Sequence, residues 1–369
     1  MVSLDVSSVP PSPAGAGRYS IDLAAALARR DDVDVSFVAR RGDADRWTAL
    51  APRGGVHAVA PASRPGRLAW EQARLPRVLR KLPVTVHHSP HYTMPESAAL
   101  PRVVTIHDLT FFDHPEWHER SKAPVFRRAT RVAARHADAL ICVSRVTADR
   151  LAALCPPQGS VHVIPHGVAD RFSPVPGDDN AVLGHLGVRP PYVAFVGTLE
   201  PRKDLPTLVQ AFDRVAAAHP DLSLVLAGFD GWGTKSLGRA IAGASHGDRI
   251  LRTGYLPDGV VPALLRHAAA VAYPSLEEGF GLPALEALAC GAPLVTTTGS
   301  AMEEVVAGAA LLVGPGDADA LAGVIDMLVR GDAGLDARRQ RGLAVAARHT
   351  WEASAAAHVA VYRSVAAQG

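Results

Sequence analysis

Short apolar runs rich in Val and Ile recur through the first half of the chain and alternate with amphipathic stretches of helical spacing. The runs lie at residues 33–38, 56–60, 84–88, 103–107, 139–143 and 161–164. Stretches that predict helices lie between several of them, at residues 21–30, 68–81, 123–136 and 146–154. Continuous apolar strands that alternate with helices are typical of a parallel sheet covered by helices on both faces.

A second series of apolar runs follows a break in this pattern. Periodicity fails between residues 170 and 191, where R-F-S-P-V-P-G-D-D-N is typical of an inter-domain linker. Strands are then predicted at 192–196, 222–227, 250–253, 269–273, 293–297 and 310–313. We therefore expect an α/β protein of two Rossmann-like, doubly wound domains facing a cleft: an N-terminal domain (1–172), a linker (173–190), a second domain (191–349) and a C-terminal helical segment (350–369).

Ligands of such sheets bind beyond the carboxyl ends of the strands, so residues directly after strands are the candidates for a site. Residues 275–291, S-L-E-E-G-F-G-L-P-A-L-E-A-L-A-C-G, follow one predicted strand. Pro283 fits the first turn of a helix, whose free amides and positive dipole end would attract an anion. Glu278 and Glu286, with seven residues between them, add carboxylates that accept hydrogen bonds from hydroxyls. The pattern favours a sugar phosphate or nucleotide sugar, with two solvated carboxylates as the alternative.

The segment E-G-F-G-L-P-A-L-E-A-L-A-C-G-A-P-L-V, residues 278–295, resembles the E-x7-E signature of the family 4 retaining glycosyltransferases. That family has the two-domain GT-B fold, in which a C-terminal helix crosses back to the N-terminal domain. The resemblance implies that Glu278 contacts the donor sugar and that Glu286 contacts the ribose hydroxyls of the nucleotide. Around them it implies a donor site formed also by Gly279, Phe280, Gly281 and Leu282.

A second motif, G-T-L-E-P-R-K-D-L at residues 197–205, follows the first strand of the second domain. Arg202 and Lys203 supply a planar fork and a point charge suited to a diphosphate leaving group, although adjacent basic residues in a loop are often only solvated. The motif resembles the family's G-T-L-E-P-R-K-N-L, and Asp204 in place of Asn puts a local cap or turn in doubt. Since no Asp-x-Asp metal motif stands beside these residues, we expect these cations to act without a bound metal.

The glycine motif A-G-A-G-R-Y, residues 14–19, opens the first predicted helix. Gly15 and Gly17 would let the backbone approach a phosphate. Ser20 stands where a dinucleotide fingerprint needs a third glycine, which disfavours NAD binding. The resemblance implies that this loop contacts the donor diphosphate and borders an acceptor pocket, with Arg18 and Tyr19 on the acceptor side.

Two further segments follow predicted strands. T-I-H-D-L, residues 105–109, places His107 and Asp108 at a strand end, where a His is either a satisfied core residue or functional. The resemblance extends from His107 through P-E-W and implies that His107 lies against the donor sugar, with Asp108 on the acceptor side. G-Y-L-P-D, residues 254–258, carries Tyr255 and Leu256, which by the same resemblance border the nucleobase.

Two weaker matches complete the resemblance. V-I-P-H-G-V, residues 163–168, is similar to the family's V-I-P-N-G-V, and we interpret its His166 as part of a turn. Residues 350–365 resemble the family's terminal Trp-containing helix.

Composition limits the class of protein. The chain has 369 residues, 48% hydrophobic and 20% charged, which is typical of a globular protein. No apolar run approaches the roughly 20 residues of a membrane span, and the N-terminus lacks the features of a signal peptide, so we expect a cytoplasmic protein. Residues 1–170 contain 22 Lys and Arg against 16 Asp and Glu, a charge of +6, which leaves −4 for the rest. The positive half is the one to face an anionic partner, although so small an imbalance is also compatible with no partner, and we expect no nucleic acid.

One basic stretch leaves two interpretations open. Arg74, Arg77, Arg80 and Lys81 lie beside an apolar stripe of Leu75, Val78, Leu79 and Leu82 at helical spacing. A second basic run includes Arg127, Arg128 and Arg131. Either the segment from Arg74 to Lys81 meets an anionic membrane surface on the cytoplasmic side, or both runs are amphipathic helices packed on a sheet with solvated outer faces.

Together with the residue patterns, the resemblance implies a retaining glycosyltransferase that moves a hexose from a nucleotide sugar to the hydroxyl of a sugar, lipid-linked or small-molecule acceptor, in glycolipid, cell-envelope or polysaccharide synthesis. Relatives with G-T-L-E-P-R-K favour GDP-mannose over a UDP-sugar, and no metal or other cofactor is expected. Retention could arise by double displacement or by front-face attack, and both stay open. The alternatives are a nucleotide-sugar epimerase of the same fold and a catalytically silent binding subunit.

Overall fold

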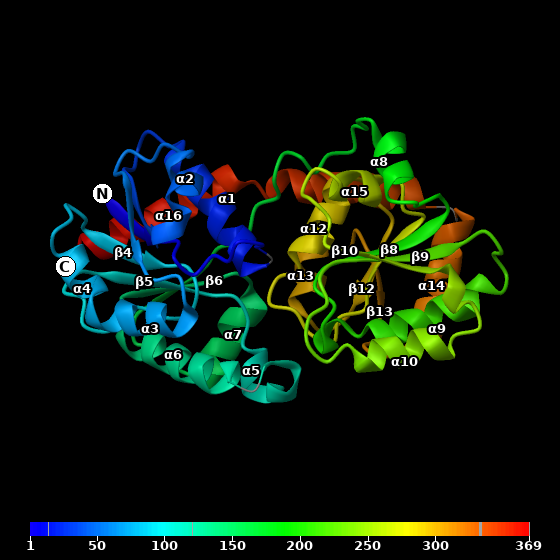
Figure 1. The fold of residues 1–369 in the computed structure, drawn as a ribbon, viewed down its shortest axis with the longest axis horizontal. Coiled ribbons are helices and arrows are strands. Elements are labelled where there is room, and N and C mark those ends of the chain that lie inside the picture. The colour runs from blue at the N-terminus through cyan, green and yellow to red at the C-terminus, as the bar shows by residue number, and fades with distance from the viewer. Residues whose placement is uncertain (14, 120, 332–333, 369) are drawn as a thin grey trace. The chain divides into compact units, whose positions relative to one another are not determined.

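The computed structural model describes residues 1–13, 15–119, 121–331 and 334–368, so Ala14 at the start of the glycine motif lies outside the described residues. The chain divides into two compact units (Figure 1). The first comprises Met1–Glu116, Arg120–Gly167 and Thr350–Gly369, and the second comprises Trp117–Glu119 and Val168–His349.

The first unit is built on a seven-stranded sheet of order β3-β2-β1-β4-β5-β6-β7. Every pairing in it is parallel. Its strands are β1 (Val2–Asp5), β2 (Val35–Arg40), β3 (Val56–Ala60), β4 (Val86–Ser89), β5 (Arg102–Ile106), β6 (Ala139–Cys142) and β7 (Ser160–Val163). Because parallel sheets are covered on both faces, the inner strands β1, β2, β4, β5 and β6 are almost wholly buried, whereas the edge strands β3 and β7 are more exposed.

Helices cover both faces of this sheet (Figure 1). They are α1 (Ala16–Ala28), α2 (Ala44–Thr48), α3 (Arg64–Ala73), α4 (Leu75–Leu79), α5 (Thr110–Asp113), α6 (Lys122–His136), α7 (Arg145–Leu154) and α16 (Trp351–Ala366), with 3-10 turns η1 (Arg41–Asp43) and η2 (Pro115–Trp117). The C-terminal helix α16 thus belongs to the unit that contains the N-terminus.

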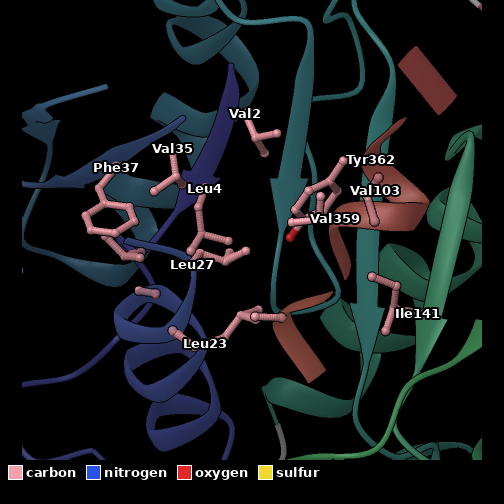
Figure 2. Close-up of a cluster of buried hydrophobic side chains, with 14 of the residues drawn as sticks. Val2, Leu4, Leu23, Leu27, Val35, Phe37, Val103, Ile141, Val359 and Tyr362 are labelled. Carbon is pink, nitrogen blue, oxygen red and sulfur yellow. The ribbon is translucent and has the colours of Figure 1, made fainter. Parts of the chain in front are cut away.

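The main core of the first unit joins both ends of the chain. Leu4 on β1, Leu23 on α1, and Val359 and Tyr362 on α16 are buried in one apolar cluster (Figure 2). Figure 2 shows Leu23 and Leu27 on the face of α1 that points toward β1, while α16 lies against the neighbouring strands. Packing of α16 on α1 and β4 therefore completes this core.

The second unit contains a six-stranded, fully parallel sheet of order β10-β9-β8-β11-β12-β13. Its strands are β8 (Tyr192–Val196), β9 (Ser223–Ala227), β10 (Ile250–Gly254), β11 (Ala270–Tyr273), β12 (Leu294–Thr297) and β13 (Leu311–Val313). Its helices are α8 (Asp179–His185), α9 (Leu205–Ala216), α10 (Lys235–Gly243), α11 (Val261–Arg266), α12 (Leu282–Ala289), α13 (Ala301–Val306), α14 (Ala318–Arg330) and α15 (Leu335–Arg348), with η3 (Pro201–Lys203) and η4 (Gly247–Arg249).

The two parallel-sheet, Rossmann-like units confirm the predicted α/β class. Helix 68–81 was predicted as one element, but α3 ends at Ala73 and α4 starts at Leu75. Pro76 is the reason, because it lacks the N–H that a continuous helix would need there and its ring obstructs the preceding turn.

The stretch predicted to be a linker forms a short helix, α8. Asp179 anchors it, because both of its carboxylate oxygens accept hydrogen bonds from Arg266 on α11, at 2.6 and 2.7 Å. Among the residues that the structure describes, no helix is long and apolar enough to cross a membrane.

Candidate functional site

The second sheet reverses its strand order between β8 and β11, which lie side by side in its middle. Loops that leave the carboxyl ends of two such strands turn to opposite faces of the sheet and leave a crevice where ligands bind. The loop after β8 contains Arg202 and Lys203, and the loop after β11 contains Glu278. The structure thus brings the two motifs of the second domain to one point of the fold.

The loop after β8 is shaped by a tight turn. Pro201–Lys203 form η3, and Asp204 follows with φ 46° and ψ 47°, in the left-handed region. Asn and Asp tolerate this conformation better than most residues, which explains why Asp can stand where the resemblance has Asn. The doubtful turn is therefore formed, and it fixes the direction in which Arg202 and Lys203 leave the backbone.

Glu278 binds both basic side chains. Its Oε2 accepts a hydrogen bond from Nη1 of Arg202, and its Oε1 accepts one from Nζ of Lys203. Arg202 also donates from Nη1 to the backbone oxygen of Glu277 at 2.8 Å and from Nη2 to Oε1 of Glu200 at 2.7 Å. Two carboxylates and two cations thus form one ion-pair cluster.

This cluster is largely removed from water, since Lys203 and Glu278 are each only 8% exposed. Burial alone would raise the pKa of Glu278, but the charges of Arg202 and Lys203 and their hydrogen bonds outweigh it and lower the pKa to about 2. Glu278 is therefore ionised at neutral pH. A buried, charged cluster at a strand end is suited to exchange partners with a charged ligand.

Gly281 connects this loop to helix α12. Its φ of 93° lies in the left-handed region, and a Cβ at this position would lie 2.3 Å from Cγ of Met302. Only glycine meets both conditions without strain. Gly281 is the N-cap of α12, so the amides from Leu282 onward begin the helix with no side-chain cap. Such amides can bind an anion.

Glu286 projects from α12 one turn further on and is 7% exposed. It lies close enough to Tyr273, the last residue of β11, that its charge adds to the effect of burial in raising the pKa of that phenol. Phe280 and Leu282 are also buried, and the Phe280 ring meets His349 edge-on with centroids 6.3 Å apart. Gly279 lies between Glu278 and Phe280 in the same buried loop.

The segment after β10 presents an aromatic surface. Tyr255 is 39% exposed and stacks on Phe229, with ring centroids 4.4 Å apart and an interplanar angle of 17°. Leu256 is buried next to it. An exposed, supported ring of this kind can stack on a planar ligand group.

In the first unit, the glycine motif lies at the start of α1. Gly15 is the exposed N-cap, with φ 44°. Gly17 is buried, and a Cβ there would lie 3.1 Å from Cβ of Pro13 and 3.3 Å from Cδ of Pro10. The small residue at Gly17 thus lets the Pro-rich loop pack on the helix, while Arg18 is partly exposed.

Tyr19, expected on the acceptor side, has a fully buried side chain. Its hydroxyl lies 2.9 Å from Oγ1 of Thr105 and 2.8 Å from Nε2 of His358. His88 continues this network, with Nε2 2.8 Å from Oγ1 of Thr105 and Nδ1 2.7 Å from the hydroxyl of Tyr362. Residues from α1, β4, β5 and α16 therefore share one buried chain of hydrogen bonds.

The donor and acceptor of each hydrogen bond in this network follow from the contact of His358 at one end of it. Nδ1 of His358 lies 2.7 Å from the backbone oxygen of Ser354, which can only accept, so Nδ1 donates. Neutral His358 then accepts from Tyr19 at Nε2, Tyr19 accepts from Thr105, and Thr105 accepts from Nε2 of His88. Burial lowers the pKa of His358 to about 4 and that of His88 well below its usual value, which keeps both rings neutral.

His107 packs against Tyr19, with ring centroids 4.9 Å apart in an edge-on arrangement. Its Nε2 donates to the backbone oxygen of Pro90 at 2.8 Å, and burial lowers its pKa. Asp108, expected on the acceptor side, accepts hydrogen bonds at Oδ1 from the amide of Thr110 at 3.1 Å and its hydroxyl at 2.8 Å. That oxygen therefore holds the start of α5.

Three histidines that surround Tyr19 and His107 in the structure were not predicted from the sequence. His166, interpreted as a turn residue, lies 4.8 Å from the Tyr19 ring and 5.8 Å from the His107 ring between centroids. His88 and His358 were read only as parts of a strand and a helix. The unusual His87-His88 pair inside an apolar strand was the available signal.

Within the described ranges, no group of three or more His, Cys, Asp or Glu side chains could hold a metal ion.

Comparisons with known families cover most of the chain. Residues 13–172 match the family described as Glycosyltransferase Family 4. Residues 185–344 match the family described as Glycosyl transferases group 1. The two matches together include the motifs of both units.

Two named relatives match over more than half of this chain. O-antigen chain mannosyltransferase B from Escherichia coli is 29% identical over 78% of this chain and 74% of its own. The GDP-mannose-dependent alpha-(1-6)-phosphatidylinositol monomannoside mannosyltransferase from Mycolicibacterium smegmatis is 33% identical over 62% of this chain and 61% of its own.

Among solved structures, sucrose-phosphate synthase from Thermosynechococcus elongatus superposes with a TM-score of 0.80. The match covers 100% of this chain and 99% of that one, at 22% sequence identity. At this level of identity the likeness concerns the fold, and it extends over the whole length of both chains.

Proposed function

Because the chain belongs to the family 4 glycosyltransferases and is thus an enzyme of nucleotide-sugar-dependent glycosyl transfer, we propose that it moves a mannosyl group from GDP-mannose to an acceptor hydroxyl with retention of configuration. The acceptor is a sugar, a lipid-linked glycan or a small hydroxylated molecule of glycolipid, cell-envelope or polysaccharide synthesis. Mannose is favoured because both relatives reported above are mannosyltransferases by name.

The observation that carries this proposal is the meeting of Arg202, Lys203 and Glu278 at the switch point between β8 and β11. Departure of a nucleoside diphosphate develops negative charge, and preorganised cations stabilise it most in a site screened from water. Arg202, Lys203 and the amides at the start of α12 supply that stabilisation. Glu278 accepts hydrogen bonds from the sugar hydroxyls.

The remaining donor contacts follow the same chemistry. Glu286 accepts from the ribose hydroxyls, and the exposed ring of Tyr255 with buried Leu256 borders the base. In the first unit, Gly15 and Gly17 leave amides near the start of α1 for phosphate, while His107 lies against the sugar. Arg18 and Asp108 line the acceptor side. Asp108 does so with its second carboxylate oxygen, Oδ2, because Oδ1 binds Thr110 at the start of α5.

A nucleotide panel tests the donor. Thermal unfolding is measured with GDP, UDP, dTDP, ADP and NAD, since a ligand at about 100 times its Kd adds roughly 2.7 kcal/mol of stability. We expect a shift with GDP that is lost in Glu286→Ala. A shift with NAD alone would contradict the proposed site.

Product analysis tests the reaction. GDP-mannose is incubated with candidate acceptors, and the anomeric configuration of the product is read by NMR. A mannoside with the donor's configuration supports retention. Conversion of the nucleotide sugar to an epimer without an acceptor would instead identify the epimerase, and inert binding would identify the silent subunit.

The transfer requires no divalent metal in this proposal. The cationic side chains of Arg202 and Lys203 take the place that a metal holds in metal-dependent transferases. Activity in excess EDTA should equal that with Mg²⁺ or Mn²⁺. Loss of activity with EDTA and its return with a metal would overturn this point.

Membrane contact, if the acceptor is a lipid, rests on exposed basic residues. Arg74, Arg77, Arg80 and Lys81 are exposed, whereas Leu75 and Leu79 of the predicted apolar stripe are buried against Val38. Contact with anionic lipid would therefore be electrostatic, without insertion of that stripe. Sedimentation with anionic vesicles should be lost when Arg77, Arg80 and Lys81 are changed to Glu; unchanged sedimentation would remove the idea.

A further inference from the structure

We propose that Glu278 competes with the donor's diphosphate for Arg202 and Lys203, and that it releases them when sugar hydroxyls give its carboxylate new partners. The inference rests on the function proposed above and concerns the selectivity of the same site. It makes Glu278 the residue by which the site prefers a nucleotide sugar to a bare nucleoside diphosphate.

The ion-pair cluster is already balanced without a ligand. Arg202 and Lys203 carry two positive charges, and Glu200 and Glu278 carry two negative ones. A diphosphate that approaches this cluster meets cations that are already paired with carboxylates. It gains a full interaction only if a carboxylate moves away.

Glu278 is the carboxylate placed to move. Each of its oxygens is bound to a different cation, Oε2 to Arg202 and Oε1 to Lys203, whereas Glu200 pairs with one cation, Arg202, among the residues that the structure describes. Glu278 also lies in the loop after β11, just before the glycines that start α12. Displacing it would free both cations at once.

Displacement has a cost, because Glu278 is buried. A carboxylate that loses its cationic partners inside a protein keeps a desolvated charge that nothing balances. Its pKa of about 2 shows how strongly the cations favour the ionised form. A bare diphosphate gives Glu278 no replacement, since phosphate oxygens at neutral pH accept hydrogen bonds and rarely donate them.

A nucleotide sugar removes this cost. Its sugar hydroxyls donate hydrogen bonds to Glu278 at the same time as its phosphates accept from Arg202 and Lys203. Both halves of the exchange are then satisfied. After transfer the sugar is gone, Glu278 returns to the cations, and the diphosphate product is expelled.

Binding measurements with two probes test the inference. Dissociation constants for GDP and for intact GDP-mannose are measured by calorimetry on the wild type and on Glu278→Gln, with UDP and UDP-glucose as the pair if the nucleotide panel selects UDP. We expect Glu278→Gln to bind GDP about tenfold more tightly than the wild type, because the competing charge is gone. The preference for GDP-mannose over GDP should fall to about one.

Glu277→Gln is the matched control. It removes the same charge from the adjacent residue of the same loop, while the backbone oxygen that Arg202 binds is kept. We expect its GDP affinity to change by less than about threefold and its preference for GDP-mannose to persist. An equal gain in both variants would assign the effect to general electrostatics and overturn the proposal.

Glu278→Asp is the second variant, in case Glu278→Gln does not fold. It keeps the charge, but the shorter side chain cannot bridge both cations, so GDP affinity should still rise. Unchanged or weaker GDP binding in a folded variant would overturn the inference. Absence of nucleotide binding in every protein, the wild type included, would instead contradict the proposed function.

Discussion

The two units place opposite kinds of buried polar cluster on sheets of the same type. In the second unit, Arg202, Lys203 and Glu278 are ionised and paired. In the first unit, Tyr19, His88 and His358 are neutral and joined by directed hydrogen bonds. Charged partners can be exchanged for a charged ligand, whereas a neutral chain with a fixed direction holds its members in one geometry. One architecture thus supports a site that changes partners and a network that does not.

The largest expected effect is on the charged cluster. Lys203→Met keeps most of the side-chain volume and removes the charge, so kcat/KM should fall about a thousandfold, the scale for loss of a preorganised electrostatic contact. Steady-state assays with donor and acceptor measure it. Lys235→Met, an exposed lysine on α10, is the control and should leave activity unchanged. Wild-type turnover in Lys203→Met would remove the assigned role.

A smaller effect is expected from pH on the neutral network. Burial lowers the pKa of His358 in the folded protein to about 4, below the usual histidine value of about 6.5, so the unfolded chain binds more protons between these values. Stability should be complete above about pH 6.5 and fall as pH drops toward 4, by about 3 kcal/mol for this one group.

Urea unfolding between pH 4.5 and 7.5 measures this dependence, with a probe in each unit if their transitions separate. His358→Gln removes one titrating group and should make the dependence less steep, while the other histidines whose pKa is lowered, His88 and His107, keep part of it. A wild-type stability that does not change over this range would show that the histidines are not held neutral.

The smallest effect should come from a single hydroxyl. Tyr19→Phe keeps the ring against His107 but breaks two hydrogen bonds of the network, and kcat should fall about tenfold with the KM for donor unchanged. Tyr362→Phe breaks the hydrogen bond at the far end of the same network. It should cost ~1 kcal/mol of stability and reduce kcat much less than Tyr19→Phe does. Equal losses of kcat in the two variants would reduce Tyr19 to a purely structural role.

The sequence predicted the layers well, because parallel strands announce themselves by local apolar runs. The strands at 56–60 and 192–196 match β3 and β8 to the residue. Where local chemistry interrupts the pattern, as at Pro76, the prediction of one helix was wrong. The loop motifs after β8 and β11 were also local, and the order of strands in a doubly wound sheet explains why they meet.

The neutral network could not be predicted, because its members are far apart in the sequence. Tyr19 and His358 are separated by 339 positions and meet only when α16 packs on α1. The ion-pair cluster was hidden for another reason. The sequence predicted that Arg202, Lys203 and Glu278 each contact a ligand. Nothing in the local sequence shows that these side chains form ion pairs with one another when no ligand is bound.

The membership of α16 in the first unit has a consequence for biosynthesis. A ribosome delivers β1 to β7 early, but the helix that fills their core is made only after the roughly 180 residues of Val168–His349. At about 5–20 residues per second, the first unit waits roughly 10 to 35 s for Val359 and Tyr362, with its apolar surface near Leu4 uncovered. The usual order, in which the N-terminal domain folds first on the ribosome, is therefore reversed. During that interval the nascent chain of this enzyme exposes apolar surface to which chaperones bind.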